Sequence, residues 1–464
     1  MILFYKSIEA ADQTSTRWYF SYYDKNLQQV WVKSAPILSP LEFKASCLTS
    51  DTLNLCFEAD KKNRNRDVNF QILRVLINRG GFILNNGKTP GLSTISFFQV
   101  IGQKGYMGLN DEEKNAQILL LDLPTGQADL IPLGTKGQSV LSYLTVDPVD
   151  MTISALVTKT LSKHASELYL TKQKPDGGFL SETLISNYNS NCTFNLAKTI
   201  KVSPDETLIT GTYNQGTQSK KGSVNETTGF FASPVISTIQ TSMNRYNFLD
   251  LKNIRQLLSE RDILNLRKKS IKKNRSEQEY SLDFSLFLHE IIVWDEQYIL
   301  VAETYYPQYH TESFTDYDFY GRPFTNTYTV FDGYRFSGVL VASFDKQGKL
   351  LWDNAMDIRN ILTYSLEPKV SVDRVGDEMV LSYLTEGKIA SAIMKGPELI
   401  EKTSFSELEL MTVNDKRLAE TNSQMVPWYD EYFLCYGYQE IRDITKGIND
   451  KKWIFFCNKV RFDR

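Results

Sequence analysis

A chain of 464 residues exceeds the size of one ordinary layered domain, so it either divides into domains or repeats one small unit. Its aromatic content of 12% favours β-structure, because aromatic side chains suit pleated, half-buried surfaces. The formal net charge of -3 argues against a general nucleic-acid-binding protein, which needs a basic surplus.

The predicted elements repeat one pattern along the chain. It opens with two apolar strands, Ile2–Ser7 and Arg17–Tyr23. Thereafter, short acidic or glycine-containing turns join apolar runs at residues 50–52, 103–105, 147–150, 204–206, 295–296, 376–378 and 430–431. Two apolar runs joined by such a turn are typical of a β-hairpin. The repeat therefore supplies seven hairpins after the opening pair.

A second kind of turn follows six of these eight strand pairs, at residues 24–28, 78–81, 124–127, 174–178, 345–349 and 395–397. The segments Tyr23–Trp31 and Phe344–Trp352 show it best, since each runs from an aromatic residue through Asp-Lys to Trp. Where no insertion intervenes, the spacing is about 45–55 residues, which is the range of propeller blades. One such four-stranded sheet cannot bury both faces, whereas successive sheets can cover each other. We predict an all-β β-propeller of seven to eight four-stranded blades, eight being favoured by count, as a single domain of residues 1–464.

The two ends of the chain look incomplete by this pattern. The first unit lacks its first strand, and the last unit lacks its fourth. We expect the sequence to be a fragment lacking about 25–50 residues before Met1, including any targeting signal. As given, it begins without the basic region and apolar stretch of a signal peptide, and no run approaches the roughly 18 apolar residues of a membrane helix.

A helical insertion is predicted at residues 233–283, where apolar residues recur at helical spacing and no Pro or Gly occurs from Phe248 to Phe284. Its basic residues could dock on an acidic partner, or the helix could pack on the propeller with a solvated basic tail. The candidate partner-binding residues in it are Arg255, Leu258, Arg261, Lys268, Lys269 and Lys272.

An aromatic-rich inter-strand loop is predicted at residues 305–334. Rings in a polar loop give a large contact area with few torsions to freeze, which suits binding of a peptide or a sugar. The alternative is that the rings pack on each other and on the adjacent blade. The candidate partner-binding residues in the loop are Tyr309, Phe314, Tyr317, Phe319 and Tyr320.

Catalytic and metal-binding motifs are absent from the sequence. Gly-x-Ser-x-Gly, the P-loop and Gly-x-Gly-x-x-Gly do not occur. Glu303, Asp316 and Asp318 are conceivable glycosidase carboxylates, but the sequence does not pair them. We therefore expect no catalytic residues, no cofactor, no metal and no enzyme activity.

Five cysteines occur, Cys47, Cys56, Cys192, Cys435 and Cys457, none of them with metal-ligand spacing. Cys435 could pair with Cys457, and Cys47 with Cys56. Buried thiols are the other interpretation.

Two segments resemble known families. Ala342–Trp352 resembles the tryptophan-bearing docking motif of quinoprotein propellers, but its Asp-to-Trp spacing is one residue short, so quinone chemistry is not implied. Val330–Asn354 is similar to uncharacterised propeller-like envelope proteins of the Bacteroidota, some of which sit near the type IX secretion and gliding machinery.

Since no catalytic motif occurs, we predict a non-catalytic binding or scaffold subunit of a larger protein assembly, with protein partners. The resemblance implies that it is periplasmic or outer-membrane associated, with a role in protein secretion. The alternative is a carbohydrate-binding or carbohydrate-active propeller that uses the aromatic loop.

Overall fold

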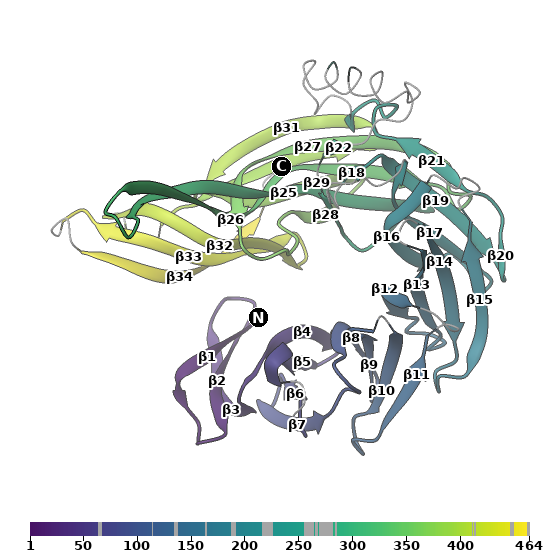
Figure 1. The fold of residues 1–464 in the computed structure, drawn as a ribbon, viewed down its shortest axis with the longest axis horizontal. Coiled ribbons are helices and arrows are strands. Elements are labelled where there is room, and N and C mark those ends of the chain that lie inside the picture. Colours follow the sequence, from purple (N-terminus) through teal and green to yellow (C-terminus); the bar gives the residue numbers. More distant parts are fainter. Residues whose placement is uncertain are drawn as a thin grey trace. The chain divides into compact units, whose positions relative to one another are not determined.

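The computed structural model describes residues 1–461 except for residues 64–66, 114, 134–137, 163–164, 187–191, 216–225, 255–263, 265–267, 269–281, 284, 411, 413 and 446–449. The described chain is almost entirely antiparallel β-structure (Figure 1). The one helical element with described bounds is the short 3-10 helix η1 (Lys61–Asn63). Of the described helices, none is long and apolar enough to span a bilayer.

The first four sheets are meanders whose strands pair in chain order. The first contains β1 (Ile2–Ala10), β2 (Ser15–Tyr23) and β3 (Gln29–Leu38). The second contains β4 (Leu41–Thr49), β5 (Thr52–Ala59), β6 (Phe70–Leu76) and β7 (Gly81–Gly87). The third contains β8 (Thr94–Ile101), β9 (Lys104–Asn110), β10 (Ala116–Asp122) and β11 (Ala128–Pro132). The fourth contains β12 (Ser139–Val146), β13 (Ile153–Ser162), β14 (Ala165–Gln173) and β15 (Phe179–Ile185).

The remaining sheets follow the same plan with additions. The fifth contains β16 (Cys192–Lys201), β17 (Glu206–Gln215), β19 (Gly229–Ile236), β20 (Ile239–Gln240) and β21 (Asn244–Asn247), while β18 (Glu226–Thr227) pairs separately with β22 (Leu282–Asp283). The sixth contains β23 (Ser285–Leu288), β24 (Ile292–Trp294), β25 (Gln297–Tyr317), β26 (Pro323–Phe344) and β27 (Leu350–Thr363). The seventh contains β28 (Ser371–Val375), β29 (Glu378–Thr385), β30 (Lys388–Lys395) and β31 (Glu398–Glu407), and the eighth contains β32 (Asp415–Tyr429), β33 (Tyr432–Asp443) and β34 (Lys451–Arg461).

The predicted turns join these strands where the sequence pattern places them. The acidic and glycine-containing turns lie between the first two strands of their sheets, for example between β4 and β5 and between β12 and β13. The Asp-Lys turns lie before the last strand, as between β2 and β3 and between β26 and β27. The predicted all-β propeller class with eight blades is confirmed.

Apolar side chains fill the space between successive sheets. Between the first and second sheets, the rings of Trp18 and Phe57 meet edge to face with their centroids 5.0 Å apart, and Phe20 and Leu55 are buried beside them. Similar clusters lie between the second and third, third and fourth, sixth and seventh, and seventh and eighth sheets. In these five pairs, one sheet covers an apolar face of the next, which removes from water the surface that one sheet alone would expose.

The helical insertion predicted for residues 233–283 is wrong at both ends. β19 continues to Ile236, and β20 and β21 fold back on it, with Phe230 opposite Tyr246. The aromatic residues here complete a sheet because the neighbouring strand offers them backbone partners and a buried face. At the other end, β22 is a strand as well.

The middle of this segment is anchored to the sixth sheet. Asp353 of β27 accepts hydrogen bonds from the backbone N–H groups of Asn253 and Ile254 at 2.7 and 3.0 Å. Among the predicted partner-binding residues here, Lys268 has helical backbone and is exposed. The others lie outside the described residues: Arg255, Leu258, Arg261, Lys269 and Lys272. Their partner-binding role stays a prediction.

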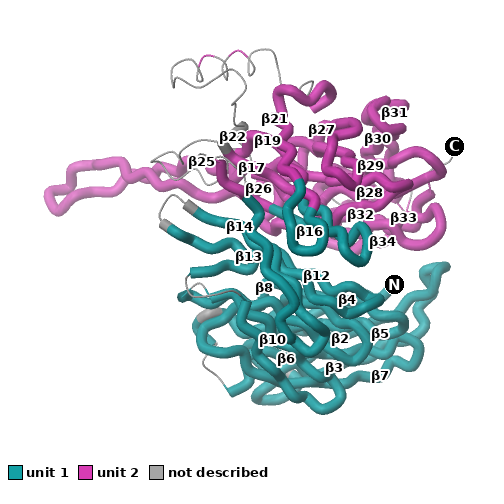
Figure 2. The backbone as a smooth tube through the Cα atoms, turned by 90° about the vertical axis from the view of Figure 1, so that its right-hand side faces the viewer, with its two compact units in different colours: residues 1–188, 197–209, 235–241 teal, residues 189–196, 210–234, 242–464 magenta. Residues whose placement is uncertain are grey.

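The chain divides into two compact units (Figure 2). Unit 1 comprises residues 1–188, 197–209 and 235–241, and unit 2 comprises residues 189–196, 210–234 and 242–464. The first four sheets belong to unit 1, and the sixth to eighth sheets belong to unit 2. Whether residues 1–464 act as a single domain stays a prediction.

Candidate functional site

The aromatic-rich segment is a long β-hairpin of unit 2, and its prediction as a loop at residues 305–334 is wrong. β25 and β26 pair from Tyr298 opposite Phe344 to Tyr317 opposite Pro323, with two register shifts. Its alternating threonines and aromatic residues favour strands. Asp318 closes the turn, because its Oδ1 accepts the backbone N–H groups of residues 320 and 322 at 2.9 and 2.8 Å. In Figure 2 the hairpin extends away from the other strands of unit 2.

The five predicted aromatic residues of the hairpin are all exposed to solvent. Phe319 and Tyr320 at the turn are 99% and 80% exposed, and their rings meet edge to face 5.7 Å apart. Tyr309, Phe314 and Tyr317 keep about half or more of their surface in water. These rings therefore do not hold the segment down on an adjacent sheet, and their partner-binding role stays a prediction.

One face of the hairpin carries a polar network among the rings. His310 contacts Asp332 through Nδ1 and Glu312 through Nε2, the latter at 3.1 Å, and the hydroxyl of Tyr328 donates to Glu312. The hydrogen bonds to Glu312 and Asp332 raise the pKa of His310. Those from Tyr328 and His310 lower the pKa of Glu312. Phe314 packs beside Tyr328, with ring centroids 6.0 Å apart.

The other face carries a ladder of hydroxyl groups. Residues directly opposite one another on paired strands share a face, and successive residues alternate between faces. Three opposed pairs on this face are hydroxyl-bearing: Thr311 with Thr329, Ser313 with Thr327, and Thr315 with Thr325. Tyr309, opposite Phe331, and Tyr317 lie on this same face at the two ends of the ladder. The hairpin thus presents rings on both faces, with the charged network on one and the hydroxyls on the other.

A polar pocket lies at the root of the hairpin, within unit 2. Its volume is about 110 Å³, which is less than that of a typical drug-sized ligand site. β27, β29 and β32, from three successive sheets, supply most of its lining (Figure 1). Residues 361–363 of β27, which line it, pair with residues 334–336 at the base of β26. The polar side chains around it are Asn360, Thr363, Lys369, Thr385, Glu386, Glu420, Thr421, Asn422 and Ser423.

Three residues of the pocket lining have left-handed backbone conformations. Asn360 has φ 59° beside a bulge in β27, and Asn422 has φ 52° beside a bulge in β32. Glu386 has φ 47° in the two-residue turn before β30, where Gly387 follows with φ 73°. Such conformations are costly for residues other than glycine, and they cluster at binding and active sites.

Two carboxylates and one amine are the charged groups of this pocket. Glu420 is buried, and its Oε2 accepts a hydrogen bond from Gln439 at 3.2 Å and lies 3.9 Å from Nε of Arg417. Glu386 is exposed, and its Oε2 accepts a hydrogen bond from Asn360 at 3.3 Å. Lys369 is 6% exposed, and burial lowers the pKa of its amine. The pocket therefore offers acid–base groups in unlike surroundings.

Glu303 fixes the loop that carries Lys369. Its carboxylate is fully buried and accepts the backbone N–H groups of Lys369 and Val370 at 2.9 to 3.0 Å. His289 contacts the same carboxylate at 2.6 Å. Glu303 is thus a positioning residue, and the structure does not bring it together with Asp316 and Asp318, which bind the backbone of their own turn.

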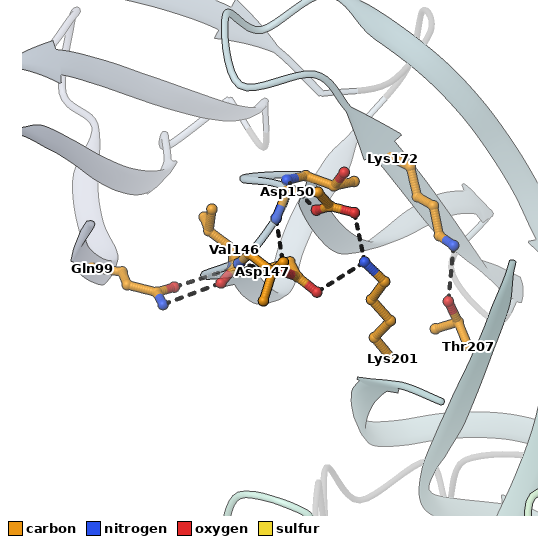
Figure 3. Close-up of polar contacts among 9 residues, drawn as sticks. Gln99, Val146, Asp147, Asp150, Lys172, Lys201 and Thr207 are labelled. Carbon is orange, nitrogen blue, oxygen red and sulfur yellow. Dashed lines mark hydrogen bonds and ion pairs between the residues drawn. The ribbon is translucent and has the colours of Figure 1, made fainter. Parts of the chain in front are cut away.

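Unit 1 holds a separate polar cluster, drawn in Figure 3. Lys201, the last residue of β16, lies between Asp147 and Asp150 of the turn after β12, at 3.0 and 2.5 Å. Lys172 of β14 donates to Thr207 of β17 at 2.8 Å. These contacts tie turns and strands of neighbouring sheets, and the carboxylates are occupied by the lysine. We assign this cluster to stability.

The cysteines are thiols, and neither the Cys47–Cys56 nor the Cys435–Cys457 disulfide is formed. Burial raises the pKa of Cys56 and of Cys435 to about 12, so neither is a reactive thiolate near neutral pH. Over the described part of the chain, no group of histidine, cysteine and acidic residues is arranged to hold a metal ion.

No protein-family model and no curated protein sequence matches the chain. Among solved structures, it is similar to the polysaccharide lyase Uly1, with TM-score 0.43 and 10% identity over 95% of this chain and 94% of that one. It is also similar to the β-propeller domain of the Trilobed protease from Pyrococcus furiosus, with TM-score 0.38 and 9% identity over 89% and 97% of the two chains. A thermostable family-43 glycoside hydrolase gives TM-score 0.30 and 11% identity over 71% and 96%.

These comparisons correct the functional expectation. Polysaccharide lyases and a glycoside hydrolase are among the similar structures, which contradicts a non-catalytic scaffold subunit and the expected lack of enzyme activity. At these identities and TM-scores, the likeness assigns no substrate and no residue role to this chain.

The pocket was not among the sequence predictions. Its lining comes from segments near residues 360, 369, 385 and 421, which no motif connects. A faint signal is the Glu386-Gly387 pair between apolar strands, since it is a tight-turn signature. The Glu386-Gly387 pair indicates where the hairpin turns, but it does not indicate which strands of the neighbouring sheets lie beside that turn.

Proposed function

We propose that this chain is a carbohydrate-active propeller that holds a saccharide chain along the β25–β26 hairpin and one saccharide unit in the pocket at its root. The observation that carries the proposal is the row of exposed aromatic rings adjoining a pocket lined by hydroxyl, amide and charged side chains. Aromatic rings offer flat apolar area to the C–H faces of sugars, and the polar groups match sugar hydroxyls.

The pocket carboxylates suit chemistry on a glycosidic bond. Such reactions commonly use two carboxyl groups on one site, kept in different protonation states by unlike environments. Glu420 is buried beside a guanidinium, whereas Glu386 stands in solvent beside an amide. Glu420 and Glu386 are the two carboxyl groups that this pocket supplies for such chemistry.

Binding is tested with a panel of neutral and acidic oligosaccharides and a triple variant, Tyr317→Ala, Phe319→Ala and Tyr320→Ala. We expect the variant to bind about tenfold more weakly or worse, because each lost ring removes contact area at little cost to the fold. Phe179→Ala is the control, since Phe179 is 67% exposed, close to the 65% of Tyr317, but lies on β15 of unit 1. If the panel contains no ligand, or if the triple variant binds as the parent does, the hairpin is not the binding platform.

Activity is tested by the appearance of new reducing ends from the bound polysaccharide. Glu420→Gln and Glu386→Gln should each reduce the rate by about a hundredfold or more, while the exposed Glu398→Gln on β31 should not. Unchanged rates in both pocket variants would remove these carboxylates from the chemistry.

The envelope location stays a proposal, supported by the resemblance of Val330–Asn354 to envelope propellers. Fractionation of the native host tests it. Recovery with the cytoplasmic fraction would overturn it.

A further inference from the structure

The pocket contains a buried cation with no hydrogen-bonded partner. Lys369 lines the pocket and is 6% exposed. Among the residues that the structure describes, none accepts a hydrogen bond from its Nζ, whereas its backbone N–H is bound by Glu303. A largely buried ammonium is costly unless it is paired, so a lysine kept unpaired at the opening of a pocket indicates a partner that arrives from outside.

The position of this cation is fixed before any ligand arrives. The carboxylate of Glu303 accepts the backbone N–H groups of both Lys369 and Val370, and His289 contacts the same carboxylate. Pro368 precedes the lysine and restricts the local backbone further. A preorganised donor does not lose loop entropy on binding, so it binds its ligand more tightly than a mobile one.

The acidic residues nearby leave the ammonium available. Glu420 shares its carboxylate with Gln439 and Arg417, and Glu386 is exposed and bound by Asn360. Burial lowers the pKa of Lys369, and Glu367, which partly opposes this effect, is exposed and accepts a hydrogen bond from Gln424. Water screens the exposed carboxylates of Glu386 and Glu367 far more than it screens a buried charge, so these two groups oppose an entering anion only weakly.

We propose that the saccharide unit in this pocket is acidic and that Lys369 binds its carboxylate or sulfate group. The inference rests on the proposed function and narrows its substrate class from saccharides in general to anionic ones. A charge-assisted hydrogen bond in a low-dielectric pocket is stronger than one to a sugar hydroxyl, which gives the lysine its selectivity.

The experiment compares ligands that differ only in charge. Oligogalacturonate and its fully methyl-esterified form share one backbone, and sulfated and desulfated galactan oligosaccharides form the second pair. Calorimetric binding is measured with the parent chain, Lys369→Met and the control Lys395→Met. The control lysine is exposed at the end of β30, where it pairs with Asp377.

We expect the parent to prefer the charged member of one pair by about tenfold or more, and Lys369→Met to abolish that preference. A preference in the galacturonate pair indicates a carboxylate ligand, and a preference in the galactan pair indicates a sulfate ligand. Methionine keeps the length of the side chain without its charge, so the variant should melt at or above the parent temperature, and Lys369→Gln serves as a second neutral variant.

The outcomes separate this inference from the proposed function. Equal binding of charged and neutral members, unaffected by Lys369→Met, overturns the acidic ligand and leaves the carbohydrate function standing. A second outcome is that free galacturonate or inorganic sulfate binds only when Lys369 is present, while no oligosaccharide binds. This result supports the anion site and overturns the carbohydrate function. Absence of binding to every probe overturns both.

Discussion

Lys201 shows how one side chain sets the ionisation of another. Its hydrogen bond to Asp150 is the largest of the effects that lower the pKa of that carboxyl from 3.8 to about 2, and the same contact raises the pKa of Lys201. The folded pKa of Asp150 lies below its unfolded value. The contact therefore stabilises the fold fully above pH 3.8, and this stability is lost as the pH falls toward 2.

Replacing Asp150 by Asn tests this linkage. Because Asp150 keeps about half of its side chain in water, we expect a loss of only about 0.5–1 kcal/mol in the free energy of unfolding at pH 6. The difference between variant and parent should shrink through the interval from pH 4 to pH 2. Urea unfolding at several pH values measures it. A difference that does not depend on pH would show that the charge of Asp150 contributes nothing.

Gly387 is needed for a close approach as well as for its backbone angle. It has φ 73°, and a Cβ there would lie 1.5 Å from Nη1 of Arg417, which donates to the carbonyls of Gly387 and Leu408 at 3.0 and 2.7 Å. Gly387→Ala must therefore displace the guanidinium that lies beside Glu420.

Gly126→Ala is the matched control for this substitution. Its φ is 74°, but nothing lies within 4 Å of its Cβ position, so it tests the backbone cost alone, about 1–2 kcal/mol. We expect Gly387→Ala to lose roughly 1–2 kcal/mol more in urea unfolding, from the broken hydrogen bonds of Arg417. Equal losses in the two variants would mean that Arg417 finds equivalent partners elsewhere.

At the scale of elements, the β25–β26 hairpin differs from every other pair of strands in unit 2. The strands have 21 and 22 residues, several times the usual length. Their outer halves are exposed on both faces, so they bury little apolar surface. The outer part of the hairpin therefore contributes little to the stability of the fold, which agrees with a role in binding.

Shortening the hairpin separates these two contributions. Deleting residues 311–329 and joining His310 to Val330, which face each other, through Asn-Gly gives a tight turn at the natural register. We expect the melting temperature to stay within about 2 °C of the parent, while oligosaccharide binding is lost. Calorimetry and the oligosaccharide panel measure the two. A fall of many degrees would show that the outer hairpin supports the fold.

The sequence predicts most strands and turns correctly, but it does not predict that the aromatic-rich segment is a β-hairpin rather than a loop. Turns such as Asp51-Thr52 and Asp345-Lys346 lie between apolar runs, and local chemistry is enough to locate them. The outer hairpin has no buried face, so its polar residues between rings are typical of a loop as much as of a strand. Only the pairing of Thr311 with Thr329 and its neighbours decides the matter, and pairing is not a local property.

Over the whole molecule, the blade count follows from the sequence and the pocket does not. The repeat can be recognised in the amino-acid sequence because each sheet has the same pattern of strands and turns as the one before it. The pocket joins Asn360, Lys369, Glu386 and Glu420 from three sheets, and their meeting depends on bulges that no periodicity records. The functional residues are found only when the sheets are in place.

Side-chain amides join neighbouring sheets in unit 1. Gln99 of β8 accepts the N–H of Val146 at 3.1 Å and donates to its carbonyl at 3.5 Å. Asn110 of β9 makes the same pair of bonds with Leu141, at 2.7 and 3.1 Å. Both therefore fasten the third sheet to β12, which is the edge strand of the fourth sheet and has no strand on its outer side to bond these groups.

Each amide should be worth more than an ordinary surface contact. Gln99→Leu and Asn110→Leu each leave one backbone N–H and one carbonyl without a partner, so we expect each to cost about 1–3 kcal/mol of unfolding free energy. Gln127→Leu, on an exposed turn of the third sheet, is the control and should cost under about 0.5 kcal/mol.

The double variant decides whether the two bonds act together. If the two contacts are independent, the losses of unfolding free energy in the single variants add up in the double variant. If both contacts hold one rigid strand, the losses are coupled by about 0.5 kcal/mol or more, because the first substitution frees one end of β12 and so weakens the hydrogen bonds at the other end. We expect such coupling, since Leu141 and Val146 lie on the same strand. Urea unfolding of the four species of the cycle measures it, and strict additivity would mean that each end of β12 is held independently of the other.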